Sequence, residues 1–485
     1  MGPSLPRVRR TPRTTPKPPK TARTRKTRQT RKITAALALS LAAALSVAGC
    51  ASEQQAAGTG GNGGNGGGVT FDPKLVAAAE AKAKEIMGNQ KLSGSLSIMG
   101  DNSGSEAALL QSFYQPFTQA TGVKVNYTGS GDNLNVVQSR VAAGNPPDLV
   151  TTAPGVMHQY AQTHTLLNLS SFMSDELNQN FTPSVNATAS IGNAVYGVYQ
   201  GFNNMELWYN PQTYTGPKAG ASWQDVQNWT AQQGKAGKTA WCNAQGGGTS
   251  NGYPGELFIE ALFAKKYGAA LTEQWGEGKL PWTSPQVKDA FQMFGAIAAN
   301  DSYVNGGVQG SLSQDTGTGS DGLVASPPTC QAVVWGSWTG GLISGSAKGV
   351  TPGQNLASMQ IPASNPQYAT TETYSSEVTY AFKDSPETRA FLQYIASDEA
   401  QTLLASANHW PVSDKNVPAS TYTDPNLQNI AKTYFGPDIQ LAAGPALLSK
   451  TAVVTGAAKG VVSYLENPSS LDTVLQGIQD LQDGK

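Results

Sequence analysis

The sequence is poor in charge and contains very few histidines and cysteines. Charged residues make up 14% of the 485 residues, and there are 3 histidines and 3 cysteines, whereas an average globular protein is about one quarter charged. Residues 1–49 contain no Asp or Glu, and residues 1–32 hold 12 of the 33 basic residues. The rest of the chain therefore has 21 basic residues against 33 acidic ones. Because binding to a phosphate backbone needs a basic surface, this acidic body excludes a nucleic-acid partner.

Sequence motifs for catalysis, metal ions and cofactors are missing as well. The chain has no phosphate-binding GxxxxGKS or GxxxxGKT and no HExxH, so ATP hydrolysis and zinc-dependent proteolysis are excluded. The histidines His158, His164 and His409 lack zinc-ligand spacing. The acidic segment 315–321 lacks calcium-loop spacing and is interpreted as a solvated loop. We therefore expect no catalytic residue, no metal site and no cofactor.

The N-terminus has the organisation of an export signal. Basic residues 1–32 precede a 17-residue apolar run, Ile33 to Gly49, and small residues lead to Cys50. The sequence Val47-Ala48-Gly49-Cys50 resembles the lipobox of bacterial lipoproteins. That resemblance implies that residues 1–49 are removed and that Cys50 carries lipid on the outer face of the cell membrane. An ordinary signal peptide or an uncleaved anchor with an incidental Cys is the alternative.

A flexible tether is predicted between Cys50 and the folded body. Residues 51–68 are rich in Gly, Asn, Gln and Ala and end in a run of glycines interrupted by Asn62 and Asn65. Such a segment cannot bury a core and behaves as a flexible coil. The remaining length is too great for one compact unit, so we expect two or three lobes.

The body begins with a helix and continues with alternating strands and helices. Segment 69–91 holds a lead-in helix over 71–87, because its apolar residues recur at helical spacing. Strands are predicted at 92–98, 123–127 and 148–150, and helices at 106–120 and 134–141. Strands separated by helices of this length predict βαβ units and a mostly parallel sheet.

The body resembles the extracellular solute-binding proteins of sugar ABC transporters. Asn145-Pro146-Pro147-Asp148-Leu149, Tyr196-Gly197-Val198 and Leu207-Trp208-Tyr209-Asn210 have the order and spacing of that family. Further segments resemble its α-glucoside-binding subgroup: Thr239-Ala240-Trp241-Cys242, Gly252-Tyr253-Pro254-Gly255-Glu256, the run 281–288, Gly306-Gly307-Val308-Gln309-Gly310 and Pro327-Pro328-Thr329-Cys330. The resemblance covers roughly residues 92–480. It departs from the family at Tyr199-Gln200, where a proline is common.

This resemblance implies an α/β fold with two lobes, similar to maltose-binding proteins, and a ligand in the cleft between them. The first lobe would comprise 92–202 and 363–405, and the second 206–360 and 410–485. Crevices at the carboxyl ends of strands are where open α/β sheets bind ligands. The implied partners are an oligosaccharide and two membrane permease subunits powered by a separate ATPase, and we expect a monomer.

Two cysteines remain once Cys50 is assigned to lipid. Outside the cytosol, Cys242 and Cys330 are most simply one disulfide. Free buried thiols are the alternative.

The tryptophans indicate a sugar site in the second lobe, since all nine follow residue 207. Sugars need flat aromatic surfaces for their CH faces and polar side chains for their hydroxyls. Trp335 and Trp338 are predicted to stack from a glycine-rich loop. The full set of predicted ligand-binding residues is Ser103, Glu106, Asp132, Asn204, Trp241, Tyr253, Glu256, Trp335 and Trp338.

Two rival functions remain open. Glu256 and Glu260 could suggest a secreted glycoside hydrolase, but catalytic carboxylates must flank the sugar from different elements. A second rival keeps the fold and binds phosphate, iron or a polyamine, against which the tryptophans argue. We therefore expect a binding protein rather than an enzyme.

Overall fold

The computed structural model describes residues 69–485, apart from 131–132, 249–250 and 435–437. The predicted export segment, Cys50, the tether and Asp132 lie outside the described residues. Among the residues described, no helix combines the length and apolar character needed to cross a membrane.

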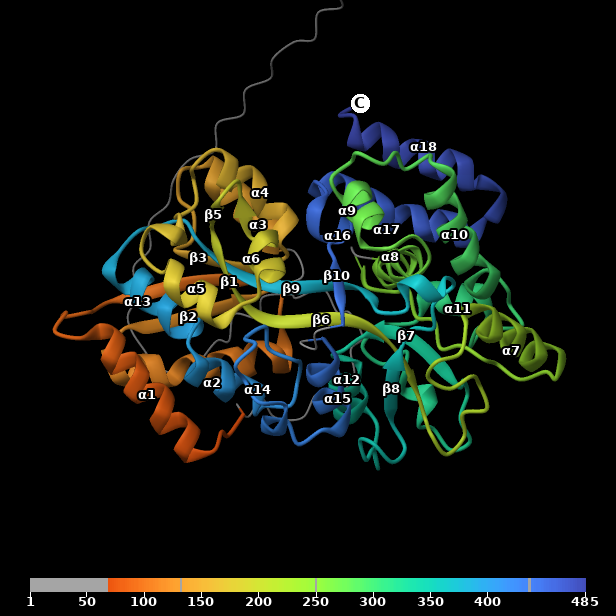
Figure 1. Cartoon of the computed structure of the whole chain (residues 1–485), viewed down its shortest axis with the longest axis horizontal. Coiled ribbons are helices and arrows are strands. Elements are labelled where there is room, and N and C mark those ends of the chain that lie inside the picture. Colours follow the sequence, from red (N-terminus) through yellow and green to blue (C-terminus); the bar gives the residue numbers. More distant parts are fainter. Residues whose placement is uncertain (1–68, 131–132, 249–250, 435–437) are drawn as a thin grey trace, which may run out of the picture. The chain divides into compact units, whose positions relative to one another are not determined.

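The predicted elements near the start of the body are present (Figure 1). The strands are β1 Ser95–Gly100, β2 Lys124–Gly129, β3 Leu149–Thr152, β4 Ser190–Ile191, β5 Ala194–Val195, β6 Gly197–Tyr209, β7 Ala332–Gly336, β8 Ala357–Gln360, β9 Thr371–Ala381 and β10 Gln440–Ala442. The helices are α1 Pro73–Met87, α2 Gly104–Thr121, α3 Asn133–Ala142, α4 Pro154–Gln162, α5 Ser174–Asn180, α6 Pro183–Thr188, α7 Trp223–Lys235, α8 Tyr253–Tyr267, α9 Ala269–Gly276, α10 Pro285–Ala298, α11 Gly307–Ser313, α12 Thr339–Ser346, α13 Pro386–Ile395, α14 Asp398–Ala405, α15 Pro425–Tyr434, α16 Pro445–Leu448, α17 Thr451–Glu466 and α18 Leu471–Gln482.

One main sheet has the strand order β2-β1-β3-β9-β6-β7, with β10 beside β9 and β8 beside β6. β1 is parallel to β2 and β3, but β9 is antiparallel to β3 and β6, and β6 is antiparallel to β7 and β8. The expectation of a mostly parallel sheet is therefore correct for the first three strands and wrong for the pairs that β6 and β9 form with β3, β7, β8 and each other, whereas β10 is parallel to β9. β9 joins the sheet from far along the chain, and local periodicity carries no information about such pairing.

The long strands β6 and β9 run side by side through the body (Figure 1). Their pairing extends from Gly197 opposite Tyr380 to Asn204 opposite Tyr374, with a change of register between Tyr199 and Gly201. The predicted lobe boundary at 202–206 falls inside β6. The unusual Gln200 is buried at this irregularity, and its Nε2 donates to Oγ1 of Thr379 at 2.9 Å.

Proline and a polar cap start several helices. Asp72 and Ser284 cap α1 and α10 by accepting a hydrogen bond from a backbone N–H of the first turn, and proline follows each cap. This arrangement satisfies an otherwise free donor and uses the fixed φ of proline. α1 packs against α2, α13 and α14, which joins the lead-in helix to the body.

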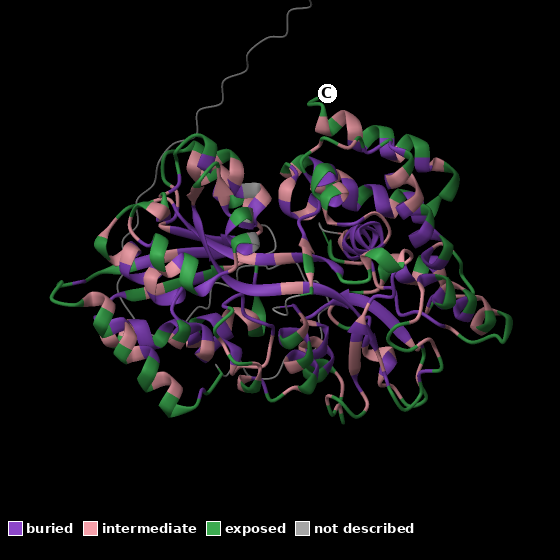
Figure 2. Cartoon of the chain, viewed as in Figure 1, coloured by how far each residue is buried: buried purple, intermediate pink, exposed green. Residues whose placement is uncertain are grey.

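α8 is buried nearly all around (Figure 2). It packs against α10, α17 and β9, and its buried residues run without a break from Pro254 to Lys265. Burial on every side is typical of a helix in a protein interior, and α8 also buries the charged residues Glu256, Glu260 and Lys265.

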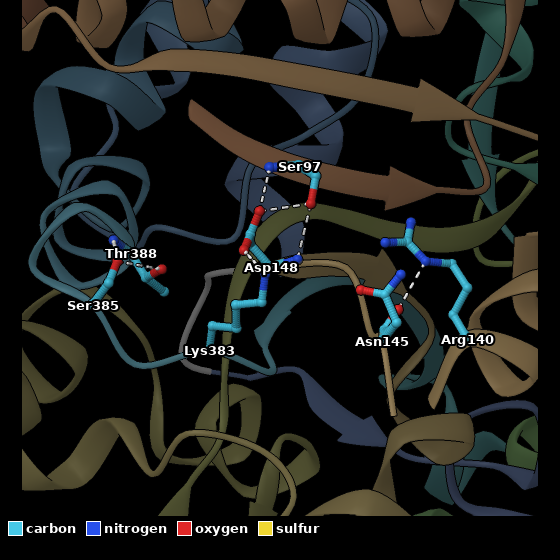
Figure 3. A network of polar contacts seen from close by, with 7 residues as sticks. All are labelled: Ser97, Arg140, Asn145, Asp148, Lys383, Ser385 and Thr388. Carbon is cyan, nitrogen blue, oxygen red and sulfur yellow. Dashed lines mark hydrogen bonds and ion pairs between the residues drawn. The ribbon is translucent and has the colours of Figure 1, made fainter. Parts of the chain in front are cut away.

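Asp148, from the family-like Asn-Pro-Pro-Asp segment, joins three parts of the chain (Figure 3). Its Oδ2 accepts hydrogen bonds from N and Oγ of Ser97, at 2.8 and 2.6 Å, and its Oδ1 pairs with Nζ of Lys383 at 2.7 Å. Partial burial raises the pKa of Asp148, but the hydrogen bonds from Lys383 and Ser97 outweigh it and leave the pKa below its usual range. The motif therefore fixes β1 and β3 to the segment after β9.

The predicted disulfide is present. Cys242 and Cys330 are bonded, with Cα atoms 5.4 Å apart and a sequence separation of 88. Both residues are buried. The bond closes a loop that contains α8 through α11.

Candidate functional site

A cavity of about 270 Å³ lies where the ends of several elements meet the two long strands. β6 and β9 contribute the side chains of their central residues, β1 and β3 contribute the turns at their carboxyl ends, and helices α2, α8 and α12 contribute residues at their first turns or caps. The lining residues are Asp101, Asn102, Glu106, Ala153, Asn203, Tyr253, Trp338, Ser375, Ser376, Glu377 and Trp410.

The two long strands supply polar side chains to the cavity. Asn203 lies opposite Ser375 in the ladder, and Gly201 lies opposite Glu377. The carbonyl of Gly201 accepts a hydrogen bond from the hydroxyl of Ser376. Residues paired across two strands point to the same face of the sheet. The pairing of Asn203 with Ser375 therefore places both side chains on the face that lines the cavity.

The turn after β1 supplies one acid, Asp101, and one amide, Asn102. Asp101 accepts a hydrogen bond at Oδ2 from Oγ1 of Thr152, at 2.8 Å. Asn102 donates from Nδ2 to Oε1 of Glu377 at 2.8 Å, and its backbone carbonyl accepts from the hydroxyl of Tyr127 at 3.2 Å. These bonds join β1, β2, β3 and β9 and hold the turn in place.

Glu106 in the first turn of α2 reaches a histidine from a distant segment. Its Oε1 lies 2.9 Å from Nε2 of His409. The ring of His409 packs against Trp410 with centroids 4.5 Å apart. This contact links α2 to the segment that follows α14.

Three aromatic rings line the cavity. Trp338 precedes α12, Tyr253 begins α8, and Trp410 follows α14. A Cβ at Gly336 would overlap the ring of Trp338, and a Cβ at Gly201 would come within 3.0 Å of the indole of Trp410. Glycine at these two positions therefore leaves the space in which the two indoles lie.

Glu377 is the most perturbed acid of the cavity. Burial, together with the nearby charges of Glu106 and Asp101, raises its pKa to about 8. Its Oε2 is buried and has no hydrogen-bond partner among the described residues.

Three predicted site residues line this cavity, namely Glu106, Tyr253 and Trp338. Ser103 lies close by as the N-cap of α2, exposed and without a side-chain capping bond. Asn204 points elsewhere: it is buried, and its Nδ2 donates to Oε1 of Glu206 at 2.6 Å. Its neighbour Asn203 lines the cavity instead, because adjacent strand residues face opposite sides.

Two predicted aromatic plates belong to the interior. Trp241 is buried between Trp229 and Phe258, and its Nε1 donates to Oγ1 of Thr230 at 2.9 Å. Trp335 lies in β7 and not in a loop, so the expectation of an exposed Gly-rich loop is wrong for this residue. It is buried behind Trp338, with ring centroids 5.1 Å apart, and supports that ring from the edge.

Glu256 is buried in the first turn of α8 and does not line the cavity. Both of its carboxylate oxygens lack partners among the described residues. Burial and the neighbouring Glu260 raise its pKa well above the usual range.

The lining residues that sequence reasoning missed come from four places: the β1–α2 turn, the β3–α4 turn, the middle of β6 and β9, and the segment after α14. Asp101 and Asn102 could have been found, because they directly follow a predicted strand. Asn203, Ser375, Ser376 and Glu377 gave no such signal, since their strand pairing joins segments far apart in sequence. Within the described residues, no group of three or more His, Cys, Asp and Glu side chains is placed to hold a metal ion.

Comparisons with known proteins give one consistent result. The family model described as bacterial extracellular solute-binding protein matches residues 101–402. The osmoprotective compounds-binding protein GgtB of Synechocystis sp. is 25% identical over 334 residues, 68% of this chain and 78% of GgtB. The α-glucosides-binding periplasmic protein AglE of Rhizobium meliloti is 25% identical over 417 residues, 83% of this chain and 90% of AglE.

Solved structures show the same fold. The bacterial solute receptor AcbH, described with an exclusive preference for β-D-galactopyranose, superposes with a TM-score of 0.68 at 19% identity, covering 81% of this chain and 99% of AcbH. Maltose-bound MalE3 of T. maritima superposes with a TM-score of 0.63. The expected maltose-binding-like, two-lobed α/β fold is therefore confirmed.

Proposed function

Because the chain belongs to the family of bacterial extracellular solute-binding proteins, we propose that it captures a saccharide, an α-linked glucoside, for import into the cell. The cavity carries this proposal. It combines three aromatic rings with carboxylate, amide and hydroxyl groups, and a sugar needs both kinds of surface.

The size of the cavity suits a short ligand. Its volume of about 270 Å³ is near the lower end of the range for small-molecule sites, roughly 300 to 1,000 Å³. Trp338 can stack on the CH face of a ring while Asn203 and Ser375 bind hydroxyls at its edge. We therefore expect an oligosaccharide to be recognised through one terminal unit.

Support for an α-glucoside comes from two directions. The subgroup-like segments of the sequence include Tyr253, which lines the cavity, and AglE is named for the same ligand class. GgtB is named for osmoprotective compounds and AcbH is described with a preference for β-D-galactopyranose. Relatives with this fold therefore bind different solutes, and the choice of an α-linked glucoside is a separate step of the proposal.

The delivery route follows from the family. We propose that lobes at 92–202 with 363–405 and at 206–360 with 410–485 close on the ligand, and that the loaded monomer hands it to an ABC permease with a separate ATPase. A hinge motion of this kind is driven by contacts that only the closed state provides. The predicted lipid on Cys50 would hold the protein at the outer face of the membrane.

Binding is tested by calorimetry and thermal unfolding of the full chain with matched α- and β-linked glucosides. A ligand present at 100 times its dissociation constant should add about 2.7 kcal/mol to the free energy of unfolding. Stabilisation by α-linked but not β-linked sugars supports the finer proposal. Failure of every saccharide to bind would refute the function.

The hydrolase alternative predicts that reducing sugar is released from the bound ligand. Glu256 and Glu260 lie on the same helix, both are buried, and neither lines the cavity. They do not flank a glycosidic bond, as catalytic carboxylates must. We therefore expect intact sugar to be recovered from the complex.

The anchor is tested separately. Cys50→Ala should move the protein from the detergent phase to the aqueous phase, because firm membrane retention needs two lipid chains. Cys242→Ala serves as the matched cysteine control and should leave the partitioning unchanged. Equal detergent-phase partitioning of Cys50→Ala and the parent would contradict the lipid anchor.

A further inference from the structure

The charge of the cavity is one-sided. Its described lining residues include the carboxyl groups of Asp101, Glu106 and Glu377 but no lysine or arginine. A carboxylate offers only acceptors, whereas a sugar hydroxyl is both donor and acceptor. The wall therefore offers more acceptors than a neutral sugar alone requires.

Two of the three acids have a hydrogen-bond partner at each carboxylate oxygen. Glu106 lies beside His409 and Asn102 in the first turn of α2, where the helix dipole favours negative charge. Asp101 accepts hydrogen bonds from Thr152 and Asn133 and lies in the turn that leads into the same helix. The starts of α8 and α12 also contribute positive ends of helix dipoles near the cavity.

Glu377 is less completely partnered. It lies in the middle of β9, and within the described residues only its Oε1 has a partner, the Nδ2 of Asn102 beside the start of α2. Its buried Oε2 has no partner among the described residues although the residue lines the cavity. A buried acceptor without a donor is costly, so the ligand is the natural source of the missing donor.

We propose that the cavity selects a saccharide carrying a protonated amine and holds that amine at Oε2 of Glu377. The inference rests on the proposed function and specifies the class of sugar. An ammonium group supplies three donors and no acceptor. The neighbouring rings of Tyr253, Trp338 and Trp410 suit such a group as well, because aromatic faces attract cations.

The pKa of Glu377, raised to about 8, fits a site that is incomplete without its ligand. A cation beside the carboxylate favours its ionised form and returns the pKa toward the usual range. Binding of an amine should therefore release a proton from Glu377 near pH 7, whereas a neutral sugar should not.

The test measures the binding of maltose and of two kinds of modified maltose to the full chain. In the first kind, one hydroxyl is replaced by an ammonium group, at each position in turn. In the second kind, one hydroxymethyl group is oxidised to a carboxylate. We expect the best amine to bind at least tenfold more tightly than maltose and the carboxylate to bind more weakly than maltose. Calorimetry in two buffers of different protonation enthalpy measures the released proton.

Glu377→Gln separates a cation from a neutral donor. The glutamine amide resembles a protonated carboxyl group, because both can donate and accept, so the preference is measured as the ratio of amine affinity to maltose affinity within each variant. The tenfold preference for the amine should disappear. Glu85→Gln makes the same substitution on α1, outside the cavity and with an exposed side chain, and should preserve the preference.

The outcomes distinguish the two levels of the argument. If maltose binds and no amine binds more tightly, the selection of an amine is refuted while the proposed function stands. If Glu377→Gln keeps the amine preference, the amine does not bind at Glu377 and the assignment is refuted. If no saccharide binds, both the function and the inference fail.

Discussion

Two glutamates lie on the same strand, β9, among similar Thr, Ser and Tyr residues, but they differ in whether the protein supplies partners for their carboxylates. Glu372 is buried and pairs with the equally buried Lys265, with further donation from Nε2 of Gln360 at 2.9 Å. Glu377, five residues along the same strand, has one oxygen without a partner and lines the cavity. The fold itself satisfies the first carboxylate and leaves the second for a ligand.

The region around Glu372 forms a complete polar network in the interior. Nζ of Lys265 also donates to the carbonyl of Ala369 at 2.7 Å, and Glu206 on β6 accepts from the hydroxyl of Tyr434 at 3.1 Å. Such a network fixes the relative position of β6, β9 and α8. Removing one of its members would leave a buried charge without a partner, which is energetically costly. The cavity differs from this region because it contains a polar group, Oε2 of Glu377, without a hydrogen-bond partner among the described residues.

The largest expected effect comes from breaking the paired region. Lys265→Ala should lower the free energy of unfolding by about 3–5 kcal/mol, because it leaves Glu372 buried without its counter-charge. Chemical denaturation measures the loss. The neighbouring Lys266→Ala is the control: its partner Asp289 is one-third exposed, so the cost should be about 1 kcal/mol or less. Similar losses in both variants would contradict the distinction between the two pairs.

Two tryptophans extend the comparison from charge to packing. Trp241→Ala should cost about 3–5 kcal/mol of stability, because the ring is buried in an aromatic cluster. Trp338→Ala should cost less stability but weaken saccharide binding by at least about 1 kcal/mol, because its ring faces the cavity. Denaturation and calorimetry on both folded variants measure the difference. A binding loss confined to Trp241→Ala would reverse the assignment.

The pH dependence of stability tests the raised pKa values directly. Burial and the charge of Glu372 raise the pKa of Glu206 to about 8, so the folded state holds a proton that the unfolded state releases between roughly pH 4.5 and 8. Stability should therefore fall as pH rises through this window, by up to about 1.4 kcal/mol per pH unit for each such group. Denaturation at pH 6 and pH 9 measures the change.

Glu206→Gln is the matched variant for that experiment. The amide cannot ionise, so the fall in stability between pH 6 and pH 9 should be smaller than in the parent. Glu85→Gln, with its exposed carboxyl on α1, should leave the fall unchanged. A parent protein that is as stable at pH 9 as at pH 6 would show that these buried acids do not hold protons.

Asp148 gives the smallest effect and the opposite sign. Asp148→Asn should cost about 1–2 kcal/mol at pH 7, because it weakens charge-assisted bonds to Lys383 and Ser97. Since the folded pKa of Asp148 is lowered, this contribution is lost as pH falls through that pKa. Asp384→Asn removes an exposed pair with Arg389 and should cost less. The same unfolding curves, extended below pH 4, provide the measurement.

Sequence reasoning was most successful where structure depends on local signals. Short stretches of sequence were enough to predict the amphipathic helix α1 and the alternation of strands and helices from β1 to β3. The disulfide was predictable because the body contains only two cysteines. The family-like segments added the fold, because their order along the chain reflects a shared architecture.

The cavity was predicted only in part, and the reason is the sheet. Glu106, Tyr253 and Trp338 lie at helix starts, which polar caps, proline and glycine mark in sequence. Asn203 on β6 and Glu377 on β9 are brought into the same cavity by the antiparallel pairing of two strands that lie far apart in sequence. No local sequence pattern encodes such a pairing. Eight of the nine tryptophans are buried, so aromatic enrichment identified a well-packed region more than it identified a site.

The change of register between Tyr199 and Gly201 has a mechanical consequence. A bulge bends its strand and increases the local twist, so deformation of the β6–β9 ladder is concentrated at this point. Gly201 lies directly against the indole of Trp410 and gives its carbonyl to Ser376. A ligand that contacts Trp410 therefore contacts the residue packed against the irregular point of the β6–β9 ladder.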